Sequence, residues 1–369
     1  MNVSFVDLVS QYRTLRTKLR KVFDDVSSGT HFIQGDEVTL FEKEFARFLG
    51  ASYSVSVNSG TDALILGMRA LRVPKGSEII VPVHTFIATA LAATENDLTP
   101  VFVDEDPEDY GMDLTDLKRK ITSKTRAIIA VHLYGQPEKI HEIQKIIKAT
   151  GRKIYLIEDA CQAHGAEYKG KKVGTFGIFS AFSFYPGKNL GAYGDAGAVV
   201  TNDEKLARHV ELLREYGQEK KYHHSMLGVN SRMDTIQAAV LRVKLPYLRS
   251  WNKTRQRWAA YFTRRINKEL PAIKTPVAKG VFHLYVVQVE KRDALLAALH
   301  NEDIQALIHY PIPLHLQKAF AHLGYKKGDF PNAERLSDRI ISLPMHPDLT
   351  KQQVDFVIQT MKGFYAEKL

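Results

Sequence analysis

Two ionisable residues each follow an apolar run that has the length and composition of a buried strand. Asp159 comes after the run 153–157, and Lys188 follows the run 178–184 through the turn formed by Pro186 and Gly187. Runs of this kind, bounded by turn residues, are typical of strands in a parallel sheet. Ligands of open α/β sheets bind at the carboxyl ends of the strands. The pattern therefore predicts an acid and a lysine at one ligand-binding edge.

An acid and a lysine at such an edge suit pyridoxal phosphate. The lysine holds the aldehyde of this cofactor as a Schiff base, and the carboxylate keeps the pyridine nitrogen protonated, so that the ring withdraws electrons. Simpler interpretations stay open at this point. Asp159 also fits a turn cap, and Lys188 is one of 51 Lys and Arg residues. An ordinary lysine, with a pKa of about 10.4, is charged at pH 7, so catalysis requires a pocket that changes it.

Other residues at strand ends could complete such a site. Gly60 and Thr61 lie where a strand gives way to a helix, and the free amides and dipole of a first helical turn attract a phosphate. A plain helix cap explains the same residues. Ser183 adds a hydroxyl at the same edge. Phe86 follows another strand, where its ring either stacks on a pyridine ring or packs in the core.

Two further kinds of site lack support in the sequence. A nucleotide-binding P-loop requires glycine at the position of Phe182 and serine or threonine at the position of Asn189, so this motif is excluded. The histidines lie without the spacing of metal ligands. We therefore expect no metal. The histidines considered are His84, His132, His309 and His315.

Strand-like and helical patterns alternate from about residue 50 to 250. Such alternation predicts a mostly parallel sheet covered on both faces. A long helical stretch covers 234–270, and Pro246 is expected to bend or break it. The pattern beyond it predicts a smaller α+β unit, with strands at 282–289 and 306–308 and helices at 292–300 and 350–365. The seven strands of the sheet are expected at 53–57, 78–82, 100–103, 127–133, 154–157, 178–184 and 198–201.

The composition is that of a soluble globular protein, with 44% hydrophobic and 25% charged residues among 369. A single cysteine, Cys161, excludes an intramolecular disulfide and fits a reducing cytosol. Residues 1–19 lack the apolar segment of a signal peptide, and no run reaches the length of a membrane span. The net charge of +10 is dispersed and lacks a nucleic-acid-binding motif, so we expect a small acidic partner, such as a nucleotide diphosphate, and neither nucleic acid nor a membrane.

Taken together, four motifs resemble those of the DegT/DnrJ/EryC1/StrS family of sugar aminotransferases. They follow in order over roughly residues 5 to 365, and the segment that contains Lys188 is most similar to enzymes that aminate C3 of a nucleotide-linked 3-keto-6-deoxyhexose, usually a dTDP-sugar. The motifs are SGTDAL from Ser59, EDACQAHG from Glu158, FSFYPGKNLG from Phe182 and NSRMD from Asn230.

The resemblance implies the fold and the roles of individual residues. The fold would be the α/β fold of type I aminotransferases, with a large domain (1–245) around a mostly parallel seven-stranded sheet and a small α+β domain (246–369). Lys188 and Asp159 would be catalytic, and Asn230 would reach the cofactor of a neighbouring subunit in a homodimer. The cofactor-binding residues would be Gly60, Thr61, Phe86, Asp159, Gln162, Ser183, Lys188 and Asn230, and the substrate-binding residues Tyr185, His309, Tyr310 and His315.

By the same resemblance, the protein would be a cytoplasmic transaminase that uses pyridoxal phosphate and passes through pyridoxamine phosphate. L-Glutamate would supply the amino group and a nucleotide-linked ketosugar would receive it. The alternatives are a C4 aminotransferase of a UDP-4-keto sugar and a non-catalytic binding protein of the same fold. A sugar dehydratase is disfavoured, because those relatives carry histidine where this chain has Lys188.

Overall fold

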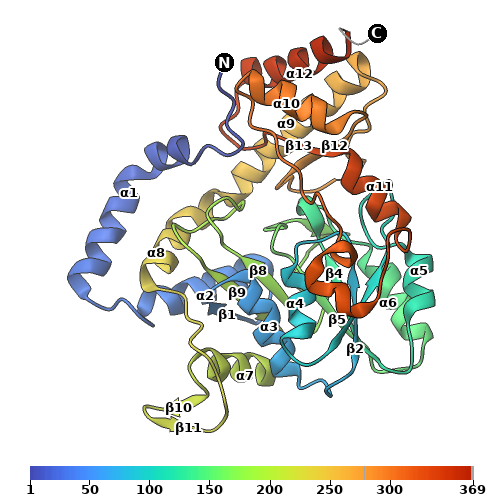
Figure 1. Ribbon diagram of the computed structural model, residues 1–369. Helices are drawn as coiled ribbons and strands as arrows, with labels where there is room; N and C mark the ends of the chain where they lie inside the picture. Colours follow the sequence, from blue (N-terminus) through green and yellow to red (C-terminus); the bar gives the residue numbers. More distant parts are fainter. Residues whose placement is uncertain (278, 367–369) are drawn as a thin grey trace.

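A seven-stranded sheet forms the centre of the larger of two regions (Figure 1). The structure is a computed structural model and describes residues 1–277 and 279–366. The strand order is β1-β9-β8-β5-β4-β2-β3, and only β9 runs antiparallel to its neighbours. The strands are β1 (Tyr53–Val57), β2 (Glu78–Pro82), β3 (Thr99–Val103), β4 (Thr125–Val131), β5 (Tyr155–Asp159), β8 (Phe179–Ser183) and β9 (Gly197–Thr201).

Helices cover both faces of this sheet because successive strand residues point to opposite sides. In β2, Ile79 and Val81 face the helices α3, α4 and α7, whereas Ile80 faces the side covered by α5 and α6. Helices α2 and α8 cover the same side over β1 and β9. Their bounds are α2 (Asp36–Leu49), α3 (Gly60–Leu71), α4 (Ala88–Thr94), α5 (Leu114–Lys120), α6 (Ile140–Ala149), α7 (Glu204–Arg214) and α8 (Thr235–Lys244).

The smaller region packs two antiparallel strands against three helices. Its core includes Phe262, Tyr285 and Ile341, and Val3 of the N-terminal arm joins it through a bridge to Ile304. Helix α1 (Leu8–Gly29) then packs along α8. The elements of the smaller region are α9 (Leu248–Glu269), β12 (Tyr285–Gln288), α10 (Arg292–Asn301), β13 (Ile340–Leu343) and α12 (Lys351–Ala366).

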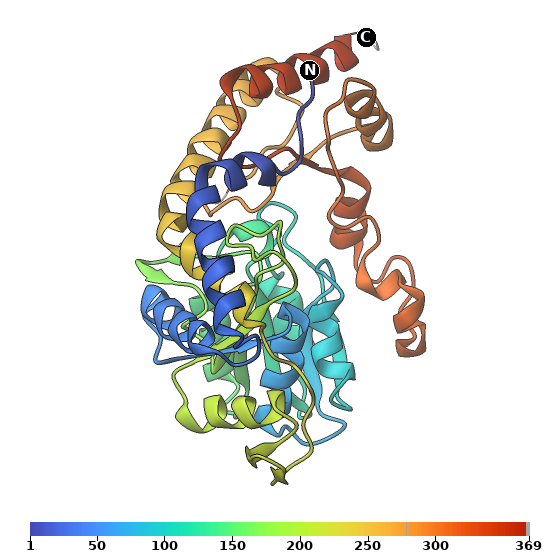
Figure 2. The same cartoon turned by 90° about the vertical axis from the view of Figure 1, so that its left-hand side faces the viewer.

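One C-terminal segment, residues 311–339, runs back along the larger region (Figure 2). Its residues Leu314, Phe320 and Phe330 lie in the core on the α3 side of the sheet. The segment contains η3 (Leu314–Leu316), η4 (Lys318–Leu323) and α11 (Pro331–Arg339). The remaining short elements are η1 (Leu133–Gly135), β6 (Glu167–Tyr168), β7 (Lys171–Lys172), β10 (Gln218–Lys220), β11 (His223–His224) and η2 (Leu245–Tyr247).

The structure confirms most of the predicted elements. All seven strands are present, and the helical stretch breaks at Pro246, within η2 between α8 and α9. The strand predicted at 306–308 is wrong, because Leu307 makes only an isolated bridge to Ser342 of β13, and the chain soon reaches Pro311, which has no N–H to donate. The domain boundary at residue 245 stays a prediction. No helix among the described residues has the length and apolar character to cross a membrane.

Candidate active site

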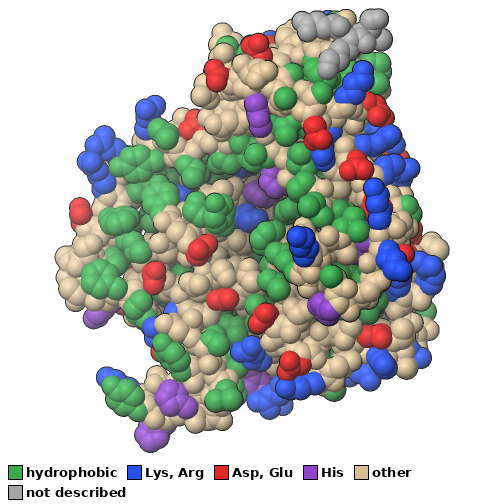
Figure 3. Space-filling view, viewed as in Figure 1, with side chains coloured by type: hydrophobic (Ala, Val, Ile, Leu, Met, Phe, Trp, Pro, Cys, Tyr) green, Lys and Arg blue, Asp and Glu red, His purple; other side chains and the backbone are tan. Residues whose placement is uncertain are grey.

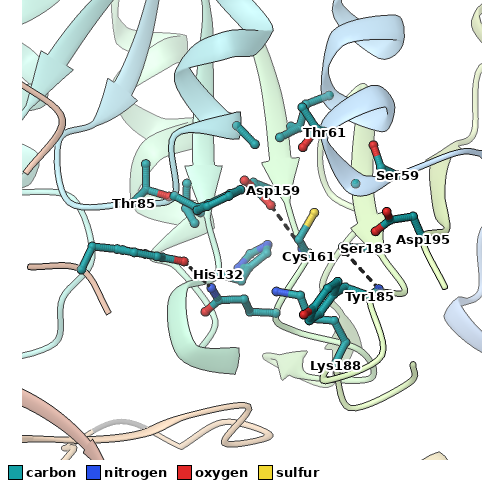
Figure 4. A pocket seen from close by; sticks show the side chains of 17 residues that line it. Ser59, Thr61, Thr85, His132, Asp159, Cys161, Ser183, Tyr185, Lys188 and Asp195 are labelled. Carbon is teal, nitrogen blue, oxygen red and sulfur yellow. Dashed lines mark hydrogen bonds between the residues drawn. The ribbon is translucent and has the colours of Figure 1, made fainter. Parts of the chain in front are cut away.

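A cavity of about 370 Å³ opens at the carboxyl ends of β5 and β8. Figure 4 shows side chains from several strands and helices pointing into it. Of the residues predicted from the sequence, it is lined by Gly60, Thr61, Phe86, Asp159, Gln162, Ser183, Tyr185, Lys188 and Tyr310. The other lining residues are Ser59, Leu64, Thr85, Ala88, Val131, His132, Cys161 and Asp195.

Asp159 is a buried carboxylate at the last position of β5. Its Oδ2 accepts a hydrogen bond from Thr89 Oγ1 at 2.8 Å, and its Oδ1 accepts one from the N–H of Cys161 at 3.2 Å. Both donors are neutral, and no ion pair of Asp159 is present among the described residues. A buried carboxylate without a cation is costly. The site therefore fits a ligand that brings a positive charge, as a pyridinium does.

Lys188 reaches the cavity from the loop after β8, where its N–H closes a turn onto Tyr185 O at 2.8 Å. Burial lowers the pKa of Lys188, although Cys161 and Asp159 act in the opposite direction. A lowered pKa increases the fraction of neutral amine at neutral pH. Because the neutral amine is the nucleophile, this lysine is prepared to attack a carbonyl carbon.

The first turn of α3 forms one end of the cavity. Ser59 caps the helix, since its Oγ accepts a hydrogen bond from the N–H of Asp62 at 3.0 Å. Ser59 is thus a helix cap, the simpler interpretation that the sequence left open for this stretch. The first N–H groups of a helix have no acceptor within it, which leaves those of Gly60 and Thr61 available beside Ser183. A Cβ on Gly60 would lie 2.6 Å from Ser183 Cβ, so only glycine allows this approach.

Gln162 and Tyr310 shape the opposite end. The side chain of Gln162 is oriented by the N–H of Tyr134, which donates to Oε1 at 2.6 Å, and its Nε2 donates to Tyr310 Oη at 3.1 Å. The hydroxyl of Tyr134 also donates to the carbonyl of His309. Phe86 lies half exposed at the rim, with its ring 5.9 Å from the ring of Tyr310.

Three predicted site residues lie outside this cavity. Asn230 is exposed and forms an isolated bridge to Glu215. The Nδ1 of His309 is 2.9 Å from Ser342 Oγ, and burial lowers its pKa to about 4. His315 is buried, with Nε2 3.0 Å from Glu334 Oε1. Whether these three take part in binding stays a prediction.

The structure adds residues that the sequence interpretation missed. Thr89 orients Asp159; it stands four residues after Thr85 behind a strand end, a helical spacing that could have indicated it. Glu158 and His132 form a buried pair 3.0 Å apart beside the cavity. Backbone N–H groups of Gly174, Phe176 and Gly177 complete the shell around this Glu158 carboxylate. Only the folded chain reveals this pair.

The donor set fits pyridoxal phosphate and offers nothing typical of a metal centre. Within residues 1–277 and 279–366, no group of three His, Cys, Asp or Glu side chains could hold a metal ion. Asp159, which forms no ion pair among the described residues, would take the pyridine nitrogen. Lys188 would take the aldehyde, and the first turn of α3 with Ser183 would take the phosphate. When bound, the group supplies an electron-withdrawing ring that stabilises negative charge on the carbon attached to the amino nitrogen.

This fold and this pair of groups define the type I aminotransferases that depend on pyridoxal phosphate. The chain belongs to the DegT/DnrJ/EryC1/StrS aminotransferase family, whose model matches residues 14–362. Solved structures of relatives hold the pyridoxamine form of the cofactor. The chain is therefore an aminotransferase that depends on pyridoxal phosphate and acts on nucleotide-linked sugars.

Several relatives cover nearly the whole chain. It is 42% identical to the dTDP-3-amino-3,6-dideoxy-alpha-D-galactopyranose transaminase of Aneurinibacillus thermoaerophilus, over 98% of this chain and 99% of the relative. It is 42% identical to the UDP-N-acetyl-3-dehydro-alpha-D-glucosamine 3-aminotransferase of Acidithiobacillus ferrooxidans, over 95% of both chains. The crystal structure of S. venezuelae DesV in complex with a ketimine intermediate matches with a TM-score of 0.95 and 40% identity, covering 98% of both chains.

Proposed function

We propose that this protein transfers the amino group of L-glutamate to C3 of a nucleotide-linked 3-keto-6-deoxyhexose, with dTDP as the nucleotide. The observation that carries the proposal is the placement in one cavity of Lys188 and of the buried Asp159, which forms no ion pair among the described residues. The names of the two relatives compared above support C3 as the aminated carbon, because both names refer to C3 of a sugar.

The side chains of the cavity divide the chemistry between them. Asp159, oriented by Thr89 and the N–H of Cys161, holds a proton on the ring nitrogen of the cofactor. Lys188 Nζ takes the proton from Cα of glutamate in the first half-reaction. In the second half-reaction, it returns a proton to C3 of the sugar. One base therefore serves both directions.

Tyr185 and Tyr310 both line the cavity. We assign them to the sugar, together with His309 and His315, which stand on the same C-terminal segment. The carbonyl of His309 is held by Tyr134, and Tyr310 is held by Gln162. This arrangement connects the substrate segment to the cofactor end of the site.

The active enzyme is proposed to be a homodimer in the cytoplasm, with Asn230 completing the phosphate end of the partner's site. Asn230 lies near a hairpin, β10 and β11, that projects from the molecule (Figure 1). Leu227, just after this hairpin, is 94% exposed. Hydrophobic side chains also gather on the side where α1 lies (Figure 3), including the exposed Val9 and Phe23. Exposed apolar patches of this kind mark protein interfaces.

A second candidate substrate, which differs in its nucleotide, also has support. The UDP-sugar relative and the dTDP-sugar relative are equally similar to this chain at 42% identity. A UDP-linked 3-keto sugar is therefore the alternative substrate. A C4 aminotransferase is the remaining alternative, and neither of these two names supports it.

A panel assay tests the proposal. Purified protein is incubated with pyridoxal phosphate, L-glutamate and either dTDP- or UDP-linked 3-keto and 4-keto sugars, and the aminated carbon is identified by NMR. We expect a dTDP-linked product aminated at C3 and formation of 2-oxoglutarate. Lys188→Ala should form neither product while keeping its fold. Amination at C4, or turnover by Lys188→Ala, would refute the assignment.

A further inference from the structure

Lys188 stands on residues 184–192, the first part of the connection between β8 and β9, here called the lysine loop. Its internal bonds close it: the N–H of Ala192 donates to Phe184 O at 2.8 Å, and a Cβ on Gly191 would lie 2.2 Å from Pro186 O. These contacts fix the shape of the loop. They do not determine where the loop lies relative to Asp159, which is on another strand.

A pair of asparagines connects the lysine loop to the loop that follows Asp159. Buried Asn189, next to Lys188, donates from Nδ2 to Asn252 Oδ1 at 2.9 Å and to Val281 O at 3.1 Å. Asn252, buried on α9, donates from its own Nδ2 to His164 O at 2.8 Å. His164 lies five residues after Asp159. One side chain of α9 thus holds both catalytic segments.

A buried lysine supports the other end of the lysine loop. Lys244, the last residue of α8, is fully buried, and its Nζ donates to Gly191 O at 2.7 Å. The Nζ also lies 4.2 Å from the centre of the Tyr193 ring. Among the described residues, it has no carboxylate partner. Burying an amine without an acid is costly. Methionine would fill this space without that cost, but it could not donate to Gly191 O.

We propose that Lys244 and Asn252 are positioning residues that hold the lysine loop where Lys188 Nζ reaches the aldehyde of pyridoxal phosphate. Neither side chain lines the cavity, so both act through the loop. The inference rests on the proposed role of Lys188. Helices α8 and α9 meet at η2, where they join the two regions. The proposal gives their ends a second function, which is to position the lysine loop.

Binding of two forms of the cofactor distinguishes a loss of lysine-loop positioning from a general disruption of the site. Pyridoxal phosphate condenses with a lysine amine, forming a C=N bond and releasing one water, whereas pyridoxamine phosphate carries an amine and makes only the non-covalent contacts. The affinity of the cofactor-free protein for each form is measured by equilibrium dialysis. The variants are Lys244→Met and Asn252→Leu, and the matched control is Lys253→Met, an exposed lysine on α9.

We expect Lys244→Met and Asn252→Leu to bind pyridoxal phosphate about tenfold more weakly, as loss of one or two buried hydrogen bonds predicts. Their affinity for pyridoxamine phosphate should stay within about twofold, since the phosphate and ring contacts are intact. Lys253→Met should change neither affinity. Asn252→Asp keeps the acceptor for Asn189 and should lie closer to the wild type than Asn252→Leu.

An equal loss of affinity for both forms, or no loss for either, would overturn the inference. If Lys244→Met does not fold, the two Asn252 variants decide it. Borohydride reduction followed by mass spectrometry of the peptide containing Lys188 separates this inference from the proposed function. An unlabelled Lys188 in the wild type refutes the function, whereas equal labelling rates in the wild type, Lys244→Met and Asn252→Leu refute only the positioning role.

Discussion

At the scale of single residues, the chemistry depends on which ionisable groups form no ion pair within the protein. Asp159 is surrounded by neutral donors, and Lys188 by groups that remove its water. Glu158, the residue before Asp159, has the opposite situation, with four donors around its carboxylate. Two adjacent acids on one strand are therefore prepared for different tasks, one to receive a ligand and one to hold the structure.

Replacing the ligand-facing acid should remove catalysis without removing binding. Asp159→Asn keeps the shape of the side chain but cannot hold a proton on the ring nitrogen. We expect turnover to fall about a hundredfold or more, the size of effect seen when one preorganised electrostatic group is lost. Steady-state kinetics measure the loss, and pyridoxamine phosphate binding should persist. Near-normal turnover would show that Asp159 has no electrostatic role.

Glu158, the acid that holds the structure, should contribute to the pH dependence of the free energy of unfolding. Burial raises the pKa of Glu158, but the hydrogen bond from His132 and the N–H groups of Gly174 and Gly177 outweigh it, so the net pKa is lowered. Stability from a lowered carboxylate pKa is present above the unfolded value and is lost as pH falls through the folded value. Glu158→Gln should therefore be less stable at pH 7 and lose less of its stability below about pH 4.5. Urea midpoints between pH 3 and 7 measure this; parallel curves would contradict it.

At the scale of elements, helix α11 is held by a side chain from another region. Its preceding residue, Phe330, has no capping group, and Pro331 has no N–H. Instead, Asp104, just after β3, accepts hydrogen bonds from the N–H of Asn332 at 3.0 Å and of Ala333 at 2.8 Å. This long-range cap fastens the segment 311–339, which contains the proposed substrate residue His315, to the large sheet.

Removing that cap should loosen one segment selectively. Asp104→Ala should lower the free energy of unfolding by about 1–2 kcal/mol, the usual value of a helix cap. Trypsin should also cleave faster at the exposed Lys326 and Lys327, because the segment separates from the sheet more often. The matched variant is Asp113→Ala, which removes the local cap of α5. Equal cleavage in both variants would show that Asp104 does not fasten the segment.

At the scale of the whole molecule, the proposed site is shared between two subunits. Asn230 lies on an exposed stretch outside the cavity of its own chain. If Asn230 serves the partner's site, Lys188→Ala inactivates the site of its own subunit, whereas Asn230→Ala inactivates the site of the partner subunit. A mixed dimer then contains one site with both residues intact.

Mixing the two inactive variants should therefore restore activity. After denaturation and refolding together, a random mixture contains about half mixed dimers, each with one working site, so roughly a quarter of wild-type activity should return under the shared-site arrangement. Refolding each variant alone is the control and should restore nothing. Mixtures that stay inactive would place Asn230 in its own subunit's site, and activity of Asn230→Ala refolded alone would place it outside catalysis.

The sequence alone determined the strands, the break at Pro246 and the positions of the acid and the lysine, because apolar runs, prolines and turn residues act locally. It could not place 306–308, since β12 pairs with Ile340–Leu343 and Leu307 only bridges to Ser342. Nor could it reveal the Glu158–His132 pair, the bond from Lys244 to the lysine loop or the cap on α11. Each of these depends on atoms that are far apart in the chain, and only the packing of the helices on the sheet brings them together.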